Sequence, residues 1–584
     1  MAMSHHDDLT TQLLSPRASD EPQTILTVRD DDSDSDSDSD SSDPTTDQPA
    51  LRKNGNHHHH RKHGRNSHSH NNDSTDDSSS LNSCNPFEFI GSTGLSVPGT
   101  TTVDPFQNET PRVDGVYEVM KIVVCLPIAL VRLVFFGLCL AVGYVATRLA
   151  LQGWKDTQNP MPKWRCRIMW VTRICARLIL FSFGYQWIRR KGKPAPREVA
   201  PIVVSNHVSY IEPIFYFYEL FATIVASESH DSIPFVGTII RAMQVIYVNR
   251  FSPSSRRHAV KEIQKRASCD SFPRVLLFPE GTTTNGKFFI SFQLGAFIPG
   301  YPIQPVIVRY PHVHFDQSWG TISLAKLMFR MFTQFHNFME VEYLPVVMPP
   351  DRQKQNVIHF AEKTSHAMAT ALNVVQTSHS YGDLMLLMRA SELKQENPRM
   401  YMVEMARIES FFHISSLEAI DFLDKFLSMN PDPSGRISFD DFLRILQLKA
   451  CAFSEEIFGF LDVEKNGSIT FKQFLFGSAH VMKQPLFQQA CELAFAKCDV
   501  EGTNYCSEQE LADIIRPAIP DLNEDEVHGL FNLFDLDNDG RISKDDFLSC
   551  LRKNPLLIAL FSPCLEMAHK DLSKDKDRTP EEIV

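Results

Sequence analysis

The stretch Asn206-His207-Val208-Ser209-Tyr210-Ile211-Glu212-Pro213 follows directly on an apolar run at 202–204. His207 and Glu212 lie five positions apart, so one continuous α-helix would turn through about 500° between them and leave their side chains about 140° apart. Pro213 disfavours helix at the residue before it and suits the first turn of a helix. We therefore expect residues 207–212 to form a strand-to-helix turn in which imidazole and carboxylate converge.

Such a pair has the parts that acyl transfer to an alcohol requires. A neutral imidazole can take the hydroxyl proton, and a carboxylate can hold that imidazole in the correct tautomer. The reaction also needs donors for the tetrahedral oxyanion. The pattern His-x4-Glu is common by chance, however, so its interpretation depends on the sequence around it.

The surrounding sequence alternates short β-rich runs with helical ones between about residues 200 and 347. This order predicts an α/β domain, which we place at residues 198–378. The expected strands are 202–204, 245–248, 275–278, 306–308 and 339–343, and the expected helices are 213–227, 256–268 and 356–373.

Two apolar segments between residues 116 and 190 precede this domain. Ile122 to Ala146 would span about 37 Å as a helix, enough to cross a hydrocarbon core of about 30 Å. Arg132 near its middle is costly for a simple span, so two interpretations stay open: a true span, or a hairpin that enters the membrane and returns. Residues 168–188 carry two arginines four positions apart, which favours a helix lying in the membrane interface.

The chain of 584 residues has a net charge of −13, but this value sums segments of opposite sign. Eight Asp fall between residues 30 and 43, whereas residues 155–197 hold eleven Lys or Arg and one acid. The basic stretch beside apolar segments predicts attraction to anionic lipid headgroups, and the basic-aromatic pattern of a nucleic-acid-binding protein does not occur. Twelve scattered cysteines without metal-site spacing favour reduced thiols in the cytosol.

Residues 1–112 are rich in Ser, Asp, His and Asn and poor in large apolar groups, which predicts a disordered tail. We see no N-terminal signal peptide. The tail carries two glycosylation sequons, at Asn72 and Asn108. If 122–146 crosses the membrane once and the α/β domain faces the cytosol, these sequons would be lumenal, although chance occurrence in an Asn-rich tail is the favoured interpretation.

Beyond about residue 400, oxygen-bearing residues recur at the positions an EF-hand loop uses to bind Ca²⁺. Four such loops begin at Asn430, Asp462, Asp499 and Asp535, with spacings of 32, 37 and 36 residues. This period predicts two EF-hand pairs in an all-α domain at 400–560, followed by a C-terminal tail at 561–584.

The four loops differ in quality. The loop at 535 is nearly ideal but ends in Asp546 rather than Glu, which makes bidentate ligation harder and lets Mg²⁺ compete. The loop at 462 ends in the neutral Gln473, which suits a structural partner, and a purely structural EF-hand pair stays open for the whole domain. The predicted metal ligands are Asp535, Asp537, Asp539, Arg541 and Asp546, then Asp499, Glu501, Thr503, Tyr505 and Glu510, and then Asn430, Asp432, Ser434, Arg436 and Asp441.

Four motifs follow one another between residues 206 and 306: Asn206–Glu212, Val245–Arg250, Phe278–Thr282 and Tyr301–Val306. Together they resemble the glycerophospholipid acyltransferase family, whose first motif is Asn-His-x4-Asp and whose third is Phe-Pro-Glu-Gly-Thr. Glu212 departs from the family's Asp by one methylene. This Glu variant, with EF-hands behind it, is similar to the plant lysophosphatidylethanolamine acyltransferases and their relatives acting on lysophosphatidylcholine.

The resemblance implies roles for particular residues. His207 would take the proton of the acceptor hydroxyl, without a covalent acyl-enzyme, and Glu212 would orient it. Arg250 would bind the acceptor phosphate together with Glu280 and Gly281, although a carboxylate is repelled by phosphate, so Glu280 suits an orienting role better. The remaining expected substrate-site residues are Thr282, Pro302 and Pro305.

The resemblance also implies an α/β acyltransferase domain of the glycerophosphate acyltransferase type, with N-terminal membrane helices. The expected partners are membrane lipids, a lysophospholipid, acyl-CoA and Ca²⁺. The expected place is the endoplasmic reticulum or Golgi membrane, with the catalytic and EF-hand domains facing the cytosol. Two alternatives stay open: lysophosphatidic acid as the acceptor, or a Ca²⁺-sensing membrane protein with a vestigial acyltransferase domain.

Overall fold

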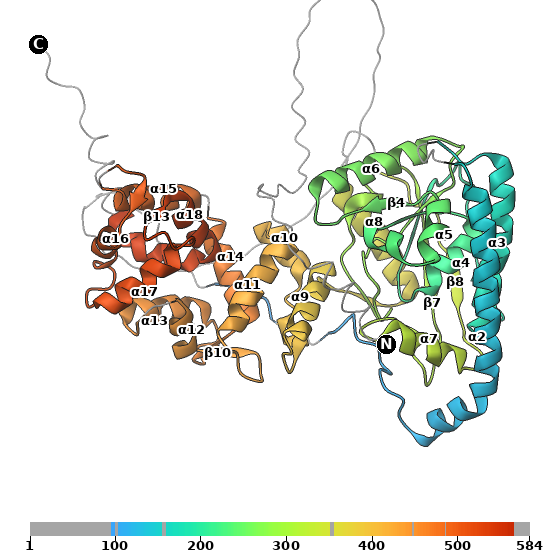
Figure 1. Cartoon of the computed structure of the whole chain (residues 1–584), viewed down its shortest axis with the longest axis horizontal. Coiled ribbons are helices and arrows are strands. Elements are labelled where there is room, and N and C mark those ends of the chain that lie inside the picture. Colours follow the sequence, from blue (N-terminus) through green and yellow to red (C-terminus); the bar gives the residue numbers. More distant parts are fainter. Residues whose placement is uncertain are drawn as a thin grey trace, which may run out of the picture. The chain divides into compact units, whose positions relative to one another are not determined.

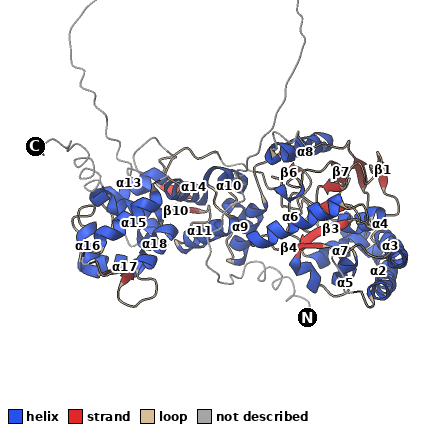
Figure 2. Ribbon diagram, turned by 90° about the horizontal axis from the view of Figure 1, so that it is seen from above, coloured by secondary structure: helices blue, strands red, loops and turns tan. Residues whose placement is uncertain are grey.

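A seven-stranded sheet forms the centre of the first half of the chain (Figures 1 and 2). The computed structural model describes residues 95–99, 103–154, 159–350, 356–446, 449–484, 486–500 and 502–565. The strand order is β1-β8-β7-β2-β5-β3-β4, and every neighbouring pair is parallel except β7 and β8. The strands are β1 (Arg189–Lys191), β2 (Ile202–Ser205), β3 (Thr223–Ser227), β4 (Ile246–Val248), β5 (Val275–Leu277), β7 (Ile303–Arg309) and β8 (Glu340–Tyr343).

Helices cover both faces of this sheet because successive strand residues point to opposite sides. On β2, Val203 packs with α4 (Ile211–Leu220) and α7 (Leu324–Phe332), whereas Ile202 and Val204 pack with α6 (Pro253–Ser268) and α8 (Val357–Leu372). β2 is therefore buried on both faces, which explains its purely apolar run. Shorter elements are η1 (Glu228–Ser232), α5 (Val236–Ala242), η2 (Leu294–Ala296), and the paired strands β6 (Phe288–Phe289) and β9 (Val375–Gln376).

All five strands expected from the sequence are confirmed, with ends shifted by a few residues. The helix expected at 213–227 is wrong beyond Leu220. Phe221 adopts a left-handed conformation that ends α4, and Thr223–Ser227 forms β3, parallel to β4 and β5. The β-branched residues of this segment pack better on a pleated sheet than on a helix.

The two apolar N-terminal segments form α2 (Val116–Leu151) and α3 (Lys163–Ser182), which pack against each other (Figure 1). Their contact is close because small residues line it: a Cβ on Gly143 would lie 3.3 Å from the Cys175 Cβ, and the Thr147 and Thr172 hydroxyls are 3.1 Å apart. By length and composition α2 could cross a membrane, and only 17% of its most apolar stretch is buried within the protein.

The arginines within these apolar helices are held by main-chain carbonyls of the α/β domain. The Arg132 guanidinium donates to the carbonyls of Phe332, at 3.1 Å, and Phe335, at 2.9 Å, and also to that of Gln334. On α3, Arg173 donates to the Tyr218 carbonyl and Arg177 to that of Tyr185. These side chains thus face protein, which removes the main objection to an arginine within the apolar segment.

Residues 103–112, which the sequence assigns to the disordered tail, instead pack against the α/β domain. The Asn108 side chain is fully buried and donates to the carbonyls of Ser318, at 2.7 Å, and Asp316, at 3.1 Å. Arg330 donates to the carbonyl of Thr110. The few apolar and amide side chains of this segment make specific contacts with the α/β domain. Amino-acid composition alone cannot predict such contacts, so the expectation of disorder is wrong here. Residues 95–99 also depart from this expectation, because Leu95 is buried among the EF-hand helices. The rest of the expected tail, residues 1–94 and 100–102, lies outside the described residues.

The second half contains two EF-hand pairs, as the loop spacing predicts. Each pair is joined by a short antiparallel ladder: β10 (Arg436–Ser438) with β11 (Ser468–Thr470), and β12 (Tyr505–Cys506) with β13 (Ile542–Ser543). The helices are α9 (Tyr381–Glu392), α10 (Met405–Phe412), α11 (Ser416–Ser428), α12 (Phe439–Leu446), α13 (Ala452–Leu461), α14 (Phe471–Met482), α15 (Phe487–Cys498), α16 (Glu508–Ile515), α17 (Glu524–Phe534) and α18 (Lys544–Lys553), with the 3₁₀ helices η4 (Pro398–Tyr401) and η5 (Pro555–Phe561).

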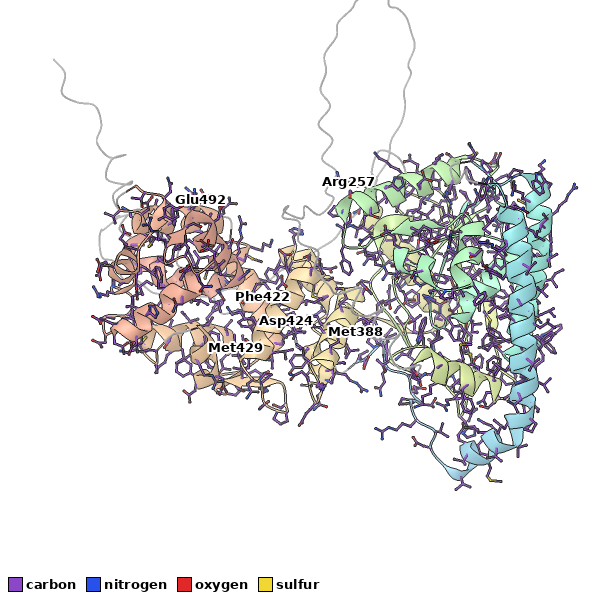
Figure 3. All side chains as sticks on the ribbon, viewed as in Figure 1. Arg257, Met388, Phe422, Asp424, Met429 and Glu492 are labelled. Atoms are coloured by element: carbon purple, nitrogen blue, oxygen red, sulfur yellow. The ribbon has the colours of Figure 1, made fainter. Side chains whose placement is uncertain are left out.

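The helix α9 is tied to the first EF-hand pair by a two-point ion pair. On α11, Asp424, shown with its neighbour Phe422 in Figure 3, accepts from Arg389 at 2.7 and 2.9 Å. In addition, Tyr401 packs edge-on against the rings of Phe426 and Phe471. The segment between the α/β domain and the first Ca²⁺ loop is therefore part of the EF-hand core.

Candidate functional site

The expected base and acid meet at the carboxyl end of β2. His207 Nδ1 lies 3.0 Å from Glu212 Oε2, and the Glu212 side chain is fully buried while that of His207 is 18% exposed. With Nδ1 donating to the carboxylate, Nε2 is left as the acceptor nitrogen. The turn thus presents a partly exposed base with a buried carboxylate behind it.

The same carboxylate also holds the turn that carries it. Glu212 accepts from the main-chain N–H of Ser209 at 3.0 Å and from that of Val208 at 3.3 Å. The helix α4 begins at Ile211, earlier than Pro213 suggests, so Glu212 lies in the first helical turn, where N–H groups lack helical partners. The longer Glu side chain folds back over these donors and still reaches the imidazole.

Neighbouring strands fix the orientation of the His207 turn. The Asn206 side chain donates to the Val308 carbonyl at 3.0 Å and accepts from the Val308 N–H at 2.8 Å, which continues the β2–β7 ladder by one residue. The Phe278 ring stacks on the His207 imidazole with centroids 4.1 Å apart. The first and third motifs therefore meet at the base itself.

Glu280 supports the His207 turn from behind. Its side chain is fully buried, and Oε1 accepts from the His207 N–H at 3.1 Å. Burial raises the pKa of this carboxyl to about 8, and the hydrogen bond from His207 only partly offsets that rise. A fully buried side chain in this position contacts the backbone of the base, in keeping with an orienting role.

Arg250 follows β4, and its guanidinium lies over the Tyr381 ring at 4.6 Å. It is half-buried, as are Gly281 and Thr282 at the turn after β5. Burial and the nearby positive charge of Arg250 together lower the pKa of His230 on η1. Arg250 is thus within electrostatic reach of His230.

The two prolines of the fourth motif belong to β7 and the loop before it, beside β2. Pro305 pairs with Val204 inside the β2–β7 ladder and is buried, and Pro302 comes just before Ile303, which pairs with Ile202. Because β2 and β7 are parallel, Pro302 lies at the amino end of the ladder, whereas Pro305 lies level with Val204, three residues before His207. Pro305 is therefore part of the sheet that directly precedes the His207 turn.

Three residues near the site were missed by sequence reasoning: Tyr381, Thr284 and Asn285. The Thr284 N–H donates to the His207 carbonyl at 2.8 Å, and the Asn285 N–H donates to the Pro105 carbonyl at 2.7 Å. The signal for the last two was their position directly after Phe-Pro-Glu-Gly-Thr. Tyr381 lies in the helix that begins the EF-hand half, and nothing in its local sequence marks it.

In the EF-hand half, the loop at 535 brings its acids together. Ligand atoms of Asp535, Asp537 and Asp539 all lie within 4.8 Å of one another. Asp535 also accepts from the N–H groups of Asp539 and Gly540, which shapes the loop. Asp546, at the last loop position, accepts from the Ser543 hydroxyl. Three converging carboxylates are a donor set that suits Ca²⁺ or Mg²⁺.

In the other loops the first acids are bonded within the loop. Asp499 accepts from the Thr503 and Asn504 N–H groups, and Asp432 accepts from those of Ser434 and Arg436. At position 12 of these loops, the expected ligands Glu510 and Asp441 accept hydrogen bonds from the hydroxyls of Ser507 and Ser438, which cap the following helices. The expected ligands Tyr505 and Arg436 lie on the strands of the two ladders. Asn430 has a left-handed backbone, and Glu501 lies outside the described residues.

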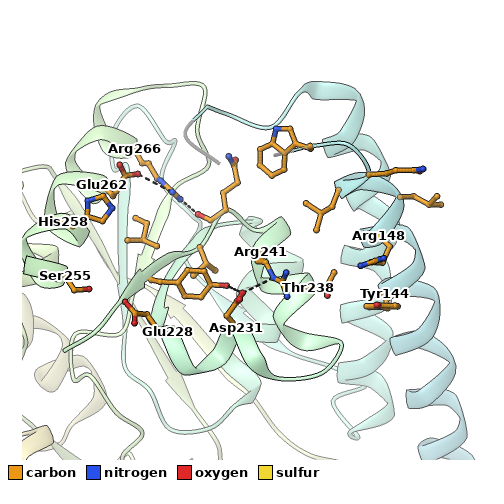
Figure 4. A pocket seen from close by; sticks show the side chains of 18 of the residues that line it. Tyr144, Arg148, Glu228, Asp231, Thr238, Arg241, Ser255, His258, Glu262 and Arg266 are labelled. Atoms are coloured by element: carbon orange, nitrogen blue, oxygen red, sulfur yellow. Dashed lines mark hydrogen bonds and ion pairs between the residues drawn. The ribbon is translucent and has the colours of Figure 1, made fainter. Parts of the chain in front are cut away.

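A separate cavity of about 1160 Å³ runs along β4, the edge strand of the sheet (Figure 4). The end of α2, helices α5 and α6, and η1 surround it. Asp231 accepts there from Tyr247 at 2.6 Å and pairs with Arg241 at 2.9 Å, and Arg266 on the α6 wall is buried. Its described lining includes three arginines and three acids but not His207, so this charge-balanced space is distinct from the catalytic pair.

Parts of the chain match known protein families. Residues 188–309 match the family described as "Acyltransferase", and residues 433–480 and 487–552 each match an EF-hand domain pair. A solved structure, the 1-acyl-sn-glycerophosphate acyltransferase PlsC of Thermotoga maritima, is 16% identical with a TM-score of 0.32, covering 44% of this chain and 97% of that one.

Among curated proteins, the lysophospholipid acyltransferase LPEAT2 of Arabidopsis thaliana is 71% identical over 481 residues, which are 82% of this chain and 89% of that protein. The lysophosphatidylcholine acyltransferase of Drosophila melanogaster is 31% identical over 466 residues, covering 78% of this chain and 86% of its own length. With the acyltransferase domain and both EF-hand pairs in place, this chain belongs to the lysophospholipid acyltransferase family and is an acyltransferase.

Proposed function

We propose that this enzyme transfers an acyl chain from acyl-CoA to the free hydroxyl of lysophosphatidylethanolamine, and also of lysophosphatidylcholine or lysophosphatidylserine, in phospholipid synthesis and remodelling. The observation that carries the proposal is the 3.0 Å contact between His207 Nδ1 and the buried Glu212 carboxylate. The 71% identity to LPEAT2 and the resemblance to plant lysophosphatidylethanolamine acyltransferases support the ethanolamine headgroup. The similarity to the Drosophila lysophosphatidylcholine acyltransferase supports lysophosphatidylcholine as a second acceptor.

In the proposed reaction, His207 Nε2 takes the proton of the acceptor hydroxyl as its oxygen attacks the thioester carbonyl. A bond forms between that oxygen and the carbonyl carbon, the carbon–sulfur bond breaks, and the imidazolium returns its proton to the leaving thiolate of CoA. Glu212 keeps Nδ1 protonated and stabilises the positive charge on the ring. Arg250 binds the acceptor phosphate, because a planar guanidinium matches phosphate oxygens.

His207→Ala tests the chemistry. We expect acyl-CoA-dependent acylation of lysophospholipids by membranes carrying the variant to fall at least about a hundredfold, because general-base catalysis contributes on that scale. His359→Ala is the matched control, since His359 is exposed on α8. Unchanged acylation in the His207 variant would instead support the alternative of a Ca²⁺-sensing protein with a vestigial domain.

The second alternative, lysophosphatidic acid as acceptor, keeps the reaction and changes the headgroup. Competition among lysolipid acceptors at equal surface density distinguishes the two. The proposal expects lysophosphatidylethanolamine to suppress acylation of lysophosphatidic acid, and the reverse order would favour a 1-acylglycerol-3-phosphate acyltransferase. Arg250→Met should raise KM for every phosphate-bearing acceptor in this panel.

We further propose that the EF-hands bind Ca²⁺ and modulate the enzyme, with the 535 loop binding most strongly. The converging Asp535, Asp537 and Asp539 support binding there. When bound, the ion supplies charge that neutralises these acids and orders the loop. Assaying acylation with Ca²⁺ and with a chelator tests the modulation.

Finally, we propose that α2 and α3 lie along one leaflet of an endoplasmic reticulum or Golgi membrane, with the catalytic and EF-hand domains in the cytosol. Both ends of α2 contact the α/β domain: Glu118 near its start pairs with Arg330 at 3.6 Å, and Tyr144 near its end packs edge-on against Phe235. A helix held along its length by one domain is poorly placed to cross the bilayer. Large apolar side chains on its other face, such as Val131 and Val134, are exposed.

A further inference from the structure

The peptide 103–110, hereafter the strap, passes over two turns that flank the catalytic residues. It lies in the chain before the membrane helix α2, far in sequence from the four acyltransferase motifs. Its Asn108 is fully buried, which is unusual for a polar residue outside a regular element. The strap's contacts lead to both sides of the His207 turn.

On one side, the strap holds the turn at 284–286. Asn285 donates its N–H to the Pro105 carbonyl at 2.7 Å, and its side chain donates to the Asp104 carbonyl at 3.0 Å and the Gln107 carbonyl at 3.3 Å. The preceding residue, Thr284, donates to the His207 carbonyl at 2.8 Å. Two adjacent residues thus join the strap directly to the backbone of the base.

On the other side, the strap holds the turn at 316–319. Asn108 donates to Ser318 and Asp316, and the Glu109 N–H donates to Asp316 Oδ2 at 2.9 Å. Trp319 then donates its N–H to the Val208 carbonyl at 2.9 Å. The carbonyls of His207 and Val208 are therefore each fixed by a turn that the strap anchors.

The strap is itself anchored on the segment that leads into the EF-hand core. Phe106 is fully buried in a cluster with Ile290, Leu387 and Met402. Asp104 pairs with Arg399 at 3.1 Å, where the aspartate is mostly buried. Ile290 belongs to the α/β domain, whereas Leu387 lies on α9 and Met402 next to Tyr401, which packs against the first EF-hand pair.

We propose that the strap is a positioning element of the active site, which holds the His207 turn in its reactive geometry and makes that geometry depend on its anchor at Phe106. The inference rests on the proposed function. Catalysis tolerates little displacement of a base from its substrate, so small shifts of the turn reduce turnover. Because the strap acts on the His207 turn through the turns at 284–286 and 316–319, loss of its contacts lowers kcat and leaves acceptor binding intact.

Two variants of the full chain test the strap, assayed in membranes with lysophosphatidylethanolamine and an acyl-CoA. Asn285→Ala removes two hydrogen bonds to the strap, and Phe106→Ala empties its apolar anchor. We expect each variant to lower kcat about tenfold, which is the scale of one or two lost hydrogen bonds. KM for both substrates should stay within about twofold of the wild-type value. Phe106→Leu, which refills the anchor with an apolar side chain, should restore most of the activity.

Arg112→Ala is the matched control, two residues beyond the strap. Its side chain is exposed at the surface, so its removal should leave kcat unchanged. Melting temperatures are measured in parallel. Wild-type kcat in Asn285→Ala and Phe106→Ala, or equal loss in Phe106→Leu, would overturn the inference. Failure of the wild-type chain to acylate any lysophospholipid would overturn the proposed function instead.

Discussion

At the residue scale, the Glu212 side chain contacts both the His207 imidazole and the main chain of the turn, which a shorter acid could not do in the same way. Its carboxylate reaches the His207 imidazole and also accepts from the Ser209 N–H. Asp at this position would be one methylene shorter on a helix that begins at Ile211. We expect Glu212→Asp to lower kcat about tenfold and Glu212→Gln to lower it further, because the amide cannot stabilise the imidazolium.

Steady-state rates of both variants, with membrane protein levels matched by immunoblot, check this expectation. Glu219→Gln, in the last turn of the same helix, is the control, since its carboxylate pairs with Arg190 rather than with the base. A fully active Glu212→Gln would show that the carboxylate does not assist the base.

Glu280 makes stability depend on pH. Burial raises the pKa of its carboxyl to about 8 in the folded chain, against the model-peptide value of 4.5. Between these two values the folded state binds more protons than the unfolded state, so the free energy of unfolding falls as pH rises. Glu280→Gln keeps the acceptor for the His207 N–H and removes this dependence.

We therefore expect the melting temperature of the Gln variant, relative to wild type, to rise steadily from pH 5 to pH 8. Differential scanning fluorimetry in detergent measures it. A constant difference across that range would mean that Glu280 is ionised when folded.

The sequence predicted the convergence of His207 and Glu212, because Pro213 limits where the helix can begin. It did not predict how the fourth motif lies against the first. Pro305 pairs with Val204 inside the β2–β7 ladder, three residues before His207, and Pro302 precedes the first pair of that ladder. This placement depends on strand register, which a short motif does not contain.

At the scale of elements, the 535 loop ends in Asp546, whose short side chain limits bidentate ligation. We expect Asp546→Glu to tighten Ca²⁺ binding about tenfold and to weaken competition by Mg²⁺, because the longer acid can offer both oxygens. Equilibrium dialysis with labelled Ca²⁺ measures both effects. Gln473→Asn, at the last position of the 462 loop, is the control and should leave the affinity unchanged.

The sequence predicted the EF-hand pairs well, since their ligands follow a fixed local spacing. Helix and strand were harder to separate at 213–227, where an apolar run suits either. Thr223–Ser227 becomes a strand because β4 and β5 are there to pair with it. From the sequence, Arg132 is costly for a membrane span and the α3 arginines favour a helix in the membrane interface. Only the folded chain brings main-chain carbonyls to Arg132 and Arg173.

At the scale of the whole molecule, the strap and the α/β domain must lie on one side of the membrane. Asn108 is buried against Ser318, so its sequon is closed to glycosylation in the folded chain. We expect epitope tags at the two ends of the chain to be equally sensitive to protease in sealed microsomes. A lumenal marker protein controls for leakage, and protection of the N-terminal tag alone would restore the single-span arrangement.

The exposed apolar faces of α2 and α3 also determine which concentration of lysolipid sets the rate of acylation. Trp164 and Trp170, each about half exposed on α3, join Val131 and Val134 on a surface suited to lipid. An enzyme resting on such a surface meets its lysolipid by lateral diffusion in two dimensions. Its velocity should then follow the mole fraction of lysolipid among the surrounding lipids, and diluting that surface with inert phospholipid should slow the reaction even when the bulk concentration stays constant.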